Sequence, residues 1–387
     1  MPLHTFHAPS AVIVGAGARY QLAEELSKIG SSRVLIVTDA HLRASGMLDD
    51  VLSLLERSGI QAHIFANVQP DPTVQNVLDG VAALRASGAD AIVAIGGGSP
   101  IDAAKIIGVA SVHQGLISDF QGYHRIPAAG PPLIAVPTTA GTGSEATKVA
   151  VITDPERQVK MMILDPKLMP RVAIVDYELT MSMPAALTAH VGVDTLTHGI
   201  EAFVSRKANP MSEAMALSCV ELTAGNLLRA WQQPDDASAR SAMSVAACQG
   251  GMAFTNSGLC LVHGMSRPLG AVFHLPHGLS NAVLLPAVTR FSVRGAPQRY
   301  ARIARTMGLA SRETPDEDAC HRLVQGLEEL NQTLEIPRLR ACINRPQHQF
   351  EAVLEKMVAD GLASGSPQNN PVVPSAEQMV ELYREAW

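Results

Sequence analysis

The chain contains 387 residues, roughly two to three times the length of a common domain, so we expect two domains. Apolar residues make up 47% and charged residues only 17%, below the average of about 25% charged, which predicts a large core or a surface buried against another subunit. A monomer is therefore disfavoured. The net charge is -6 and the 30 Lys and Arg are scattered, which argues against a nucleic-acid-binding protein.

The sequence lacks the features of membrane proteins, of secreted proteins and of proteins that stack bases or sugars on aromatic side chains. Apolar stretches fall short of the roughly 18 residues of a membrane span, and the N-terminal segment MPLHTFHAPS has no basic region followed by an apolar one. Five cysteines without a CxxC pair fit reduced, buried thiols. Aromatic residues at 4% leave no stacking platform for bases or sugars. We expect a soluble, cytoplasmic protein.

The first part of the chain alternates short β-branched runs with helical stretches, which is typical of βαβ units around a mostly parallel sheet. The predicted strands are AVIVG from Ala11, RVLIVTD ending at Asp39, QAHIFA from Gln61, AIVAIG ending at Gly96, PLIAVPTT ending at Thr139 and VAIVD ending at Asp176. Two segments between them, YQLAEELSKIG and VQNVLDGVAALRASG, have apolar residues at helical spacing and stop at glycine.

After Pro184 the apolar period is near 3.6 residues and strand signals become few. The predicted helical segments are MSEAMALSCVELTAGNLLRAWQ, SARSAMSVAACQGGMAF, APQRYARIARTMG, DEDACHRLVQGLEEL, QFEAVLEKMVADG and SAEQMVELYREAW. We therefore expect an α/β domain over residues 1–180 and an all-helical domain over residues 181–387, joined near residues 177–185.

The segment AIVAIGGGSPIDAAKIIGVA predicts a strand, a glycine turn and a helix. We predict Ser99 as the N-cap, Pro100 as the first helical residue and Asp102 as the partner in a capping box. The glycines 96–98 let backbone N–H groups approach an anion, and the helix dipole favours negative charge. A pyrophosphate would fit there; an ordinary tight βα turn is the alternative.

Two further features bear on a dinucleotide. Gly15 and Gly17 supply half of a dinucleotide fingerprint, but Tyr20 occupies the third glycine position, so we predict only a turn entering the first helix. Asp39 ends a strand at a distance from the chain start that suits ribose hydroxyls, and its carboxylate would repel a 2′-phosphate. This favours NAD over NADP.

The segment VPTTAGTGSEATKV predicts a loop rich in hydroxyl donors after a strand. Its hydroxyl side chains are Thr138, Thr139, Thr142, Ser144 and Thr147. Farther on, Lys160 stands alone beside an apolar run. It could hold a ribose or phosphate group, or be a surface lysine whose stem covers apolar neighbours.

Residues suited to a metal occur in two segments. In HVGVDTLTHGIEAFVS, Asp194 and His198 are four residues apart in a helical pattern and so share a face. The segment CLVHGMSRPLGAVFHLPHGLSNAVLLP adds His263, His274 and His277. Single histidines are usually core or surface residues, but one carboxylate grouped with three imidazoles suits Fe²⁺ or Zn²⁺, with an open position for a substrate oxygen.

Four segments in this order resemble the iron-containing (group III) alcohol dehydrogenase family over most of the chain. They are GGGSPIDAAK from Gly96, PTTAGTGSE from Pro137, DTLTHGIEAFVS from Asp194 and VHGMSRPLGAVFHLPHGLSNAVLLP from Val262. The resemblance implies a dehydroquinate synthase-like architecture with a metal in the cleft between two domains. The first is a Rossmann-like α/β dinucleotide-binding domain over residues 1–180, and the second is a helical metal-binding and catalytic domain over residues 181–387. Its implied metal ligands are Asp194, His198, His263 and His277. Its implied cofactor contacts are Asp39, Gly97, Gly98, Ser99, Thr138, Thr139, Thr147 and Lys160. His274 falls outside the pattern.

The sequence departs from the family at two positions. Arg267 stands where the family has a second histidine, and a guanidinium cannot act as a base. Either water or a ribose hydroxyl carries the alcohol proton, or Arg267 serves the substrate. Cys260 stands where the family often has glycine, which predicts a buried spectator thiol or a metal-proximal oxidation site.

We expect an NAD-dependent, divalent-metal-dependent alcohol dehydrogenase that interconverts a small primary alcohol, diol or ω-hydroxy acid and its aldehyde. The alternative is a non-redox NAD and metal enzyme resembling dehydroquinate synthase, which would need more basic residues around the metal than Arg267. A degenerate binding protein is disfavoured because all four ligand positions are intact. We also expect at least a homodimer, paired through an edge strand at AVIVG.

Overall fold

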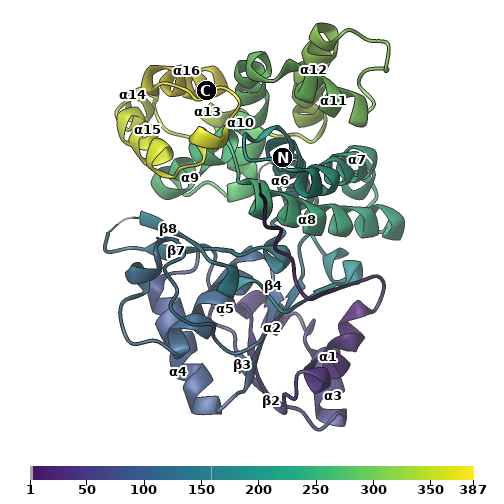
Figure 1. Ribbon diagram of the computed structural model, residues 1–387, viewed down its shortest axis with the longest axis vertical. Helices are drawn as coiled ribbons and strands as arrows, with labels where there is room; N and C mark the ends of the chain where they lie inside the picture. Colours follow the sequence, from purple (N-terminus) through teal and green to yellow (C-terminus); the bar gives the residue numbers. More distant parts are fainter. Residues whose placement is uncertain (1–2, 158) are drawn as a thin grey trace. The chain divides into compact units, whose positions relative to one another are not determined.

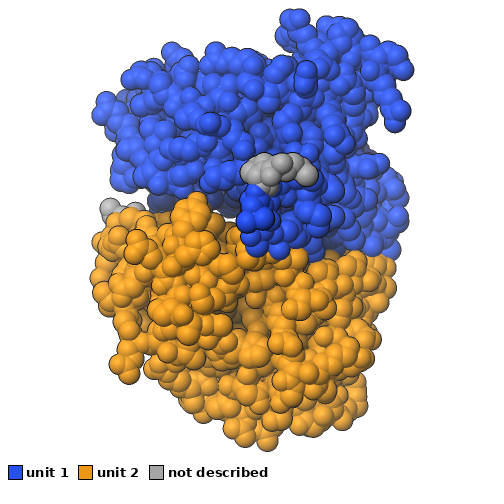
Figure 2. Space-filling model, in the orientation of Figure 1, with its two compact units in different colours: residues 1–6, 183–387 blue, residues 7–182 orange. Residues whose placement is uncertain are grey.

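The structure is a computed structural model that describes residues 3–157 and 159–387. The described chain forms two compact units. One unit contains residues 7–182, and the other contains residues 183–387 together with the described residues that precede His7 (Figure 2). The first of these units combines β-sheets with helices, and the second is helical.

The first unit is built on a parallel sheet in the order β1-β9-β6-β4-β2-β3. The strands β2, β3 and β4 of this sheet are labelled in Figure 1. Its strands are β1 (Ala11–Val14), β2 (Arg33–Val37), β3 (Gln61–Phe65), β4 (Ala91–Gly96), β6 (Leu133–Pro137) and β9 (Val172–Val175). All six strand predictions are confirmed. The three strands β4, β6 and β9 are buried at every residue, as expected when both faces of a parallel sheet are covered.

Alternate residues of β2 show the two covered faces. Leu35 joins a core cluster with residues of α4 and α5, whereas Val34 joins a cluster with residues of α1 and α3. The helices of this unit are α1 (Leu22–Lys28), α2 (Ala40–Ala44), α3 (Asp49–Arg57), α4 (Val74–Ser87) and α5 (Gly98–Ser111). As predicted, α4 stops at a glycine, Gly88, whose φ of 60° is left-handed. Short 3₁₀ turns are η1 (Ala18–Gln21), η2 (Ile117–Phe120), η3 (Ser144–Ala146), η4 (Pro166–Leu168) and η5 (Tyr177–Thr180).

A second, three-stranded sheet was not predicted. It contains β5 (Gly122–Tyr123), β7 (Val149–Asp154) and β8 (Val159–Leu164) in the order β5-β8-β7. The strands β7 and β8 pair antiparallel and place Lys160 opposite Thr153. Lys160 is therefore a strand residue, and in the apolar run beside it Met161 and Ile163 form the buried side of β8.

The second unit is helical, as predicted. Its helices are α6 (Ala185–Val204), α7 (Pro210–Gln232), α8 (Ala237–Ser257), α9 (Leu261–Phe273), α10 (His277–Ser292), α11 (Pro297–Thr306), α12 (Asp316–Thr333), α13 (Leu339–Ile343), α14 (Gln347–Glu351), α15 (Leu354–Ala363) and α16 (Ala376–Ala386), with 3₁₀ turns η6 (Val293–Gly295) and η7 (Pro367–Asn369). The helices α6, α7 and α8 pack against one another, and α10 packs on α6 and α9. Among the described residues, no helix is long and apolar enough to cross a membrane.

Candidate functional site

The helix α6 carries two of the predicted metal ligands. Asp194 and His198 lie four residues apart and are 1% and 3% exposed. Because residues at this spacing share a face of a helix, the Asp194 Oδ1 and His198 Nε2 atoms come within 3.5 Å of each other. The regular helix therefore fixes half of the ligand set.

The other two predicted ligands come from α9 and α10. His263 is the third residue of α9 and is buried, whereas His277 is the first residue of α10 and has 43% of its side chain exposed. The Nε2 atoms of His263 and His277 lie 3.5 Å and 3.9 Å from Asp194 Oδ1. The ligand atoms of all four residues lie within 4.8 Å of one another.

The charged groups inside this cluster shift one another's pKa values. Burial alone would raise the pKa of Asp194, but His198, His277 and His263 lower it below its usual value. Burial lowers the pKa of His263, yet Glu201 and Asp194 outweigh it and raise that pKa above its usual value. The ring nitrogen of His277 faces the other ligands. Desolvation lowers the pKa of His277 to about 3, because the positive charges of His263, His198 and Arg267 add to it and Asp194 only partly offsets it.

The donor set fits a divalent metal. A carboxylate oxygen and three imidazole nitrogens within 4.8 Å of one another are a donor set typical of Zn²⁺ and Fe²⁺ sites. Three of these four residues are buried, and buried acceptors that face one another are costly unless a cation satisfies them. Asp194, His198, His263 and His277 would therefore hold the ion.

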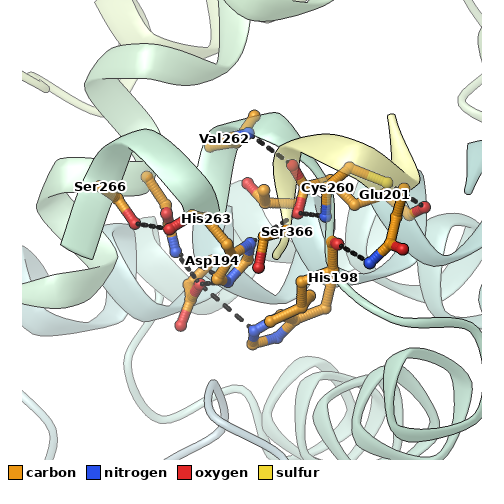
Figure 3. A network of polar contacts seen from close by, with 12 residues as sticks. Asp194, His198, Glu201, Cys260, Val262, His263, Ser266 and Ser366 are labelled. Atoms are coloured by element: carbon orange, nitrogen blue, oxygen red, sulfur yellow. Dashed lines mark hydrogen bonds and ion pairs between the residues drawn. The ribbon is translucent and has the colours of Figure 1, made fainter. Parts of the chain in front are cut away.

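Two residues that the sequence analysis did not single out also contact the ligands. Glu201 follows His198 by three residues on α6, and its Oε2 lies 2.7 Å from His263 Nδ1 (Figure 3). Asn281 follows His277 by four residues on α10, and its Nδ2 donates to Asp194 Oδ1 at 2.6 Å. Helical spacing from a predicted ligand was the signal that could have identified both.

Three other predicted positions lie near the ligands in sequence. Arg267 lies one turn after His263 and donates from Nη1 to Ser366 Oγ at 2.9 Å. Cys260 is buried at the N-cap position of α9, and burial raises the pKa of its thiol, so the thiol is protonated and unreactive. His274 is exposed, follows the last residue of α9 as its C-cap in the left-handed conformation, with φ 57°, and lies outside the ligand cluster.

The glycine turn after β4 leads directly into α5. Gly98 and Ser99 are partly exposed although the strand before them is buried, and the N-cap Gly97 has no capping side chain. A Cβ on Gly98 would lie 3.0 Å from the Thr142 side chain, so glycine lets the loop that carries Thr142 approach the start of α5 closely. The first-turn N–H groups of α5 are thus available to an anion.

The predicted cap of α5 is wrong in its details. The helix begins at Gly98 with Gly97 as N-cap, so Ser99 and Pro100 lie inside the first turn. Asp102 does not form a capping box, because its carboxylate accepts from Ser144 Oγ at 2.5 Å and from the Val151 backbone N–H at 2.9 Å. Tertiary partners compete successfully with the local cap.

The hydroxyl-rich loop is tied to α5 by the buried Lys105. Its Nζ donates to Ser144 Oγ and Thr147 Oγ1, both at 2.9 Å, and to the Val149 carbonyl at 2.7 Å. Nζ also lies 3.7 Å from Asp102 Oδ1. Thr147 is 1% exposed, so its hydroxyl helps to hold the loop. Thr139, by contrast, has a buried Oγ1 that lacks a hydrogen-bond partner among the described residues.

The remaining predicted cofactor residues have defined places. Asp39 is the N-cap of α2 and accepts from the Leu42 N–H at 2.8 Å while staying partly exposed. Thr138 follows β6 and is buried. Lys160 Nζ pairs with Asp71 at 2.8 Å. The open glycine turn and the orphaned Thr139 hydroxyl, at the carboxyl ends of β4 and β6, fit a dinucleotide.

Comparison with known proteins agrees with this geometry. Residues 9–177 match the model of the iron-containing alcohol dehydrogenase family, and residues 188–387 match the model of the C-terminal part of the Fe-containing alcohol dehydrogenase family. The chain is 37% identical to the NAD-dependent methanol dehydrogenase of Bacillus methanolicus, covering 98% of this chain and 99% of that protein.

Two further relatives are similar over the whole chain. The 1,3-propanediol dehydrogenase of Klebsiella pneumoniae is 36% identical, with 100% of this chain and 98% of that protein covered. A crystal structure of a 1,3-propanediol oxidoreductase superposes with a TM-score of 0.96 at 35% identity, and covers 100% of both chains.

Proposed function

The chain belongs to the iron-containing alcohol dehydrogenase family, and from this premise we propose that it oxidises a small primary alcohol, diol or ω-hydroxy acid with NAD and reduces the matching aldehyde. The observation that carries the proposal is the convergence of Asp194, His198, His263 and His277. The relatives named for methanol and 1,3-propanediol support a small alcohol as substrate.

Different residues of the chain would have different roles in this reaction. Asp194, His198, His263 and His277 would hold the metal, which supplies a Lewis acid that makes an alcohol proton easier to lose and polarises an aldehyde carbonyl. The backbone at Gly97, Gly98 and Ser99 would bind the pyrophosphate, and Thr138, Thr139 and Lys160 would line the cofactor site, while Thr147 would hold its loop in place through Lys105. Asp39 would bind the ribose hydroxyls. The protein thereby orients the alcohol carbon against the nicotinamide and excludes water.

The proposal is tested with His263→Ala and a matched control, His274→Asn. His274 lies outside the ligand set, and asparagine tolerates its left-handed backbone. We expect His263→Ala to lose most of its bound metal and its NAD-dependent alcohol oxidation, while His274→Asn keeps both. Metal content by mass spectrometry and NADH absorbance are the measurements. Full metal and activity in His263→Ala would contradict the proposal.

A non-redox reaction like that of dehydroquinate synthase is the alternative, and the family match and the relatives favour the dehydrogenase over it. An assay that follows NADH across a panel of alcohols separates the two. A dehydrogenase accumulates NADH in proportion to product, whereas a non-redox enzyme leaves NAD unchanged at the end of the reaction.

We propose that the chain forms at least a homodimer in the cytoplasm. The strand β1 lies at the edge of the parallel sheet, where its free backbone groups can pair with a second copy, and the five free cysteines suit a reducing compartment. Light scattering should give a mass that is a multiple of 41.0 kDa. A stable species of one chain at micromolar concentration would contradict the dimer.

A further inference from the structure

Glu201 lies on the same face of α6 as two of the predicted ligands, three residues after His198 and seven after Asp194. It is 3% exposed, and its carboxylate contacts three N–H groups at the start of α9. Its Oε2 accepts from the Cys260 backbone at 2.9 Å and its Oε1 from the Val262 backbone at 2.6 Å (Figure 3). The third contact is the His263 ring, whose Nδ1 lies 2.7 Å from Oε2.

The two backbone contacts fix where α9 begins. The N-cap residue Cys260 supplies no side-chain cap, so the first N–H groups of α9 depend on Glu201 for acceptors. A negative charge at this end also interacts favourably with the helix dipole. Because His263 is the third residue of α9, this anchor sets the position of its imidazole relative to α6.

The third contact decides which nitrogen of His263 faces the other ligands. Both Glu201 oxygens already accept from backbone N–H groups, so the short contact to Nδ1 is one in which the ring donates. An imidazole that keeps its hydrogen on Nδ1 presents a lone pair on Nε2. That Nε2 atom lies 3.5 Å from Asp194 Oδ1, inside the ligand cluster.

Glu201 also adds a second negative charge beside the ligand cluster. Asp194 brings one buried carboxylate to the site, and the three imidazoles bring none when they are neutral. A divalent ion held by Asp194 alone would leave one buried positive charge uncompensated, which is costly. A second buried carboxylate joined to the cluster through His263 makes the centre neutral.

We propose that Glu201 is a positioning residue of the metal centre: it holds His263 in the tautomer and place that bind the ion through Nε2. The inference rests on the metal site of the proposed function, but it does not depend on which reaction the enzyme catalyses. Carboxylates that orient a histidine ligand in this way typically account for a 10- to 100-fold difference in metal affinity.

The test uses Glu201→Gln and Glu201→Asp. Glutamine keeps the shape of the side chain, but its NH₂ group must face one of the three N–H donors, whereas aspartate keeps two acceptor oxygens on a shorter stem. The control is Asp236→Ala, which removes the capping carboxylate of α8 from the Ala239 N–H. This control lowers stability by loss of a helix cap and of the ion pair with Arg229, without touching a ligand.

The readouts are Zn²⁺ affinity by competition with a chelator and the visible absorption of the Co²⁺-substituted enzyme. We expect Glu201→Gln to bind Zn²⁺ about 10- to 100-fold more weakly than wild type and to change the Co²⁺ bands. Glu201→Asp should lie between the two, and Asp236→Ala should match wild type in affinity and spectrum.

Each outcome decides the matter. If both Glu201 variants bind Zn²⁺ as wild type does and lose only stability, as Asp236→Ala does, Glu201 is a helix cap alone and the proposal is wrong. If Glu201→Gln does not fold, weaker binding by Glu201→Asp supports the proposal and unchanged binding overturns it. If wild type itself binds no Zn²⁺ or Co²⁺, the proposed function fails as well.

Discussion

Asn281 and Asp194 lie 87 residues apart in the chain and are joined by a hydrogen bond of 2.6 Å from Asn281 Nδ2 to Asp194 Oδ1. The same nitrogen lies 3.0 Å from His263 Nε2 and 3.2 Å from His277 Nε2. Asn281 is fully buried, so its amide covers the face of the ligand set formed by these three residues. The amide thereby orients the Asp194 carboxylate.

We predict that Asn281→Ala binds Zn²⁺ about tenfold more weakly than wild type, because the Asp194 carboxylate loses the group that orients it. The matched control is Ser280→Ala on the same buried turn, since the Ser280 hydroxyl bonds to the Pro276 carbonyl instead of a ligand. Chelator competition measures both. Equal affinities of the two variants would show that Asn281 has only a packing role.

The second prediction concerns the choice between NAD and NADP. Asp39→Asn keeps an oxygen that can cap α2 through the Leu42 N–H and removes the charge that would repel a 2′-phosphate. We expect the ratio of kcat/KM for NADP to that for NAD to rise about tenfold, which matches a charged contact of ~1 to 3 kcal/mol. Asp39→Gly should raise this ratio too, but at some cost in stability from the lost cap. An unchanged ratio in both would place the ribose elsewhere.

How much of the site the sequence predicts depends on how local each relationship is. The helical spacing of Asp194 and His198 predicts a shared face, and α6 provides it. Glu201 continues the same face, but its partners Cys260, Val262 and His263 lie 59 to 62 residues away, and only the hydrogen bonds between Glu201 and the start of α9 reveal them.

The errors in the first unit have the same physical origin. Asp102 stands where a capping box would place it, yet Ser144 and Val151, 42 and 49 residues later, take its carboxylate. The strands β7 and β8 were not predicted, because only alternate residues of each strand are buried. Each strand is stabilised by pairing with the other, and the composition of one segment does not reveal such a partner. Local sequence patterns therefore predict helices and strands, whereas contacts between residues far apart in the sequence determine the partners of the polar side chains.

The third prediction tests the buried pair of Lys105 and Asp102. Lys105→Met keeps the volume but leaves the Asp102 carboxylate without its cation, so we expect the free energy of unfolding to fall by about 3 to 5 kcal/mol. Adding Asp102→Asn should restore part of this loss, since the unpaired charge is then removed. Urea denaturation measures all three variants. A double variant no more stable than Lys105→Met would mean that the lysine hydrogen bonds, and not the pair, account for the effect.

The same lysine predicts a dependence of stability on pH. Burial, only partly offset by Asp102 and Glu145, lowers the pKa of Lys105 to about 8, below its ordinary value of 10.5. Between these values the unfolded chain holds a proton that the folded chain has lost, so this group makes the free energy of unfolding rise with pH, by at most ~1.4 kcal/mol per pH unit. The difference between wild type and Lys105→Met should show this slope above about pH 8. A flat difference from pH 8 to 10.5 would contradict it.

The last prediction concerns Arg267, which stands one turn after the ligand His263 and whose positive charge contributes to lowering the pKa of His277. We propose that its guanidinium favours substrates with an anionic far end, because a guanidinium can bind a carboxylate through two hydrogen bonds. Its hydrogen bond to Ser366 is the competing explanation, in which Arg267 serves the scaffold.

Arg267→His is compared with wild type on a simple primary alcohol and on an ω-hydroxy acid of similar length. An arginine that binds the substrate predicts a selective loss on the acid, with kcat/KM about tenfold lower or more, as expected for a charge-assisted contact of roughly 1.5 to 3 kcal/mol. Ser366→Ala is the control, because it removes the partner of Arg267 and leaves the charge in place. If Arg267→His lowers kcat/KM equally on both substrates and Ser366→Ala does the same, the guanidinium acts through Ser366 on the scaffold and does not bind the substrate.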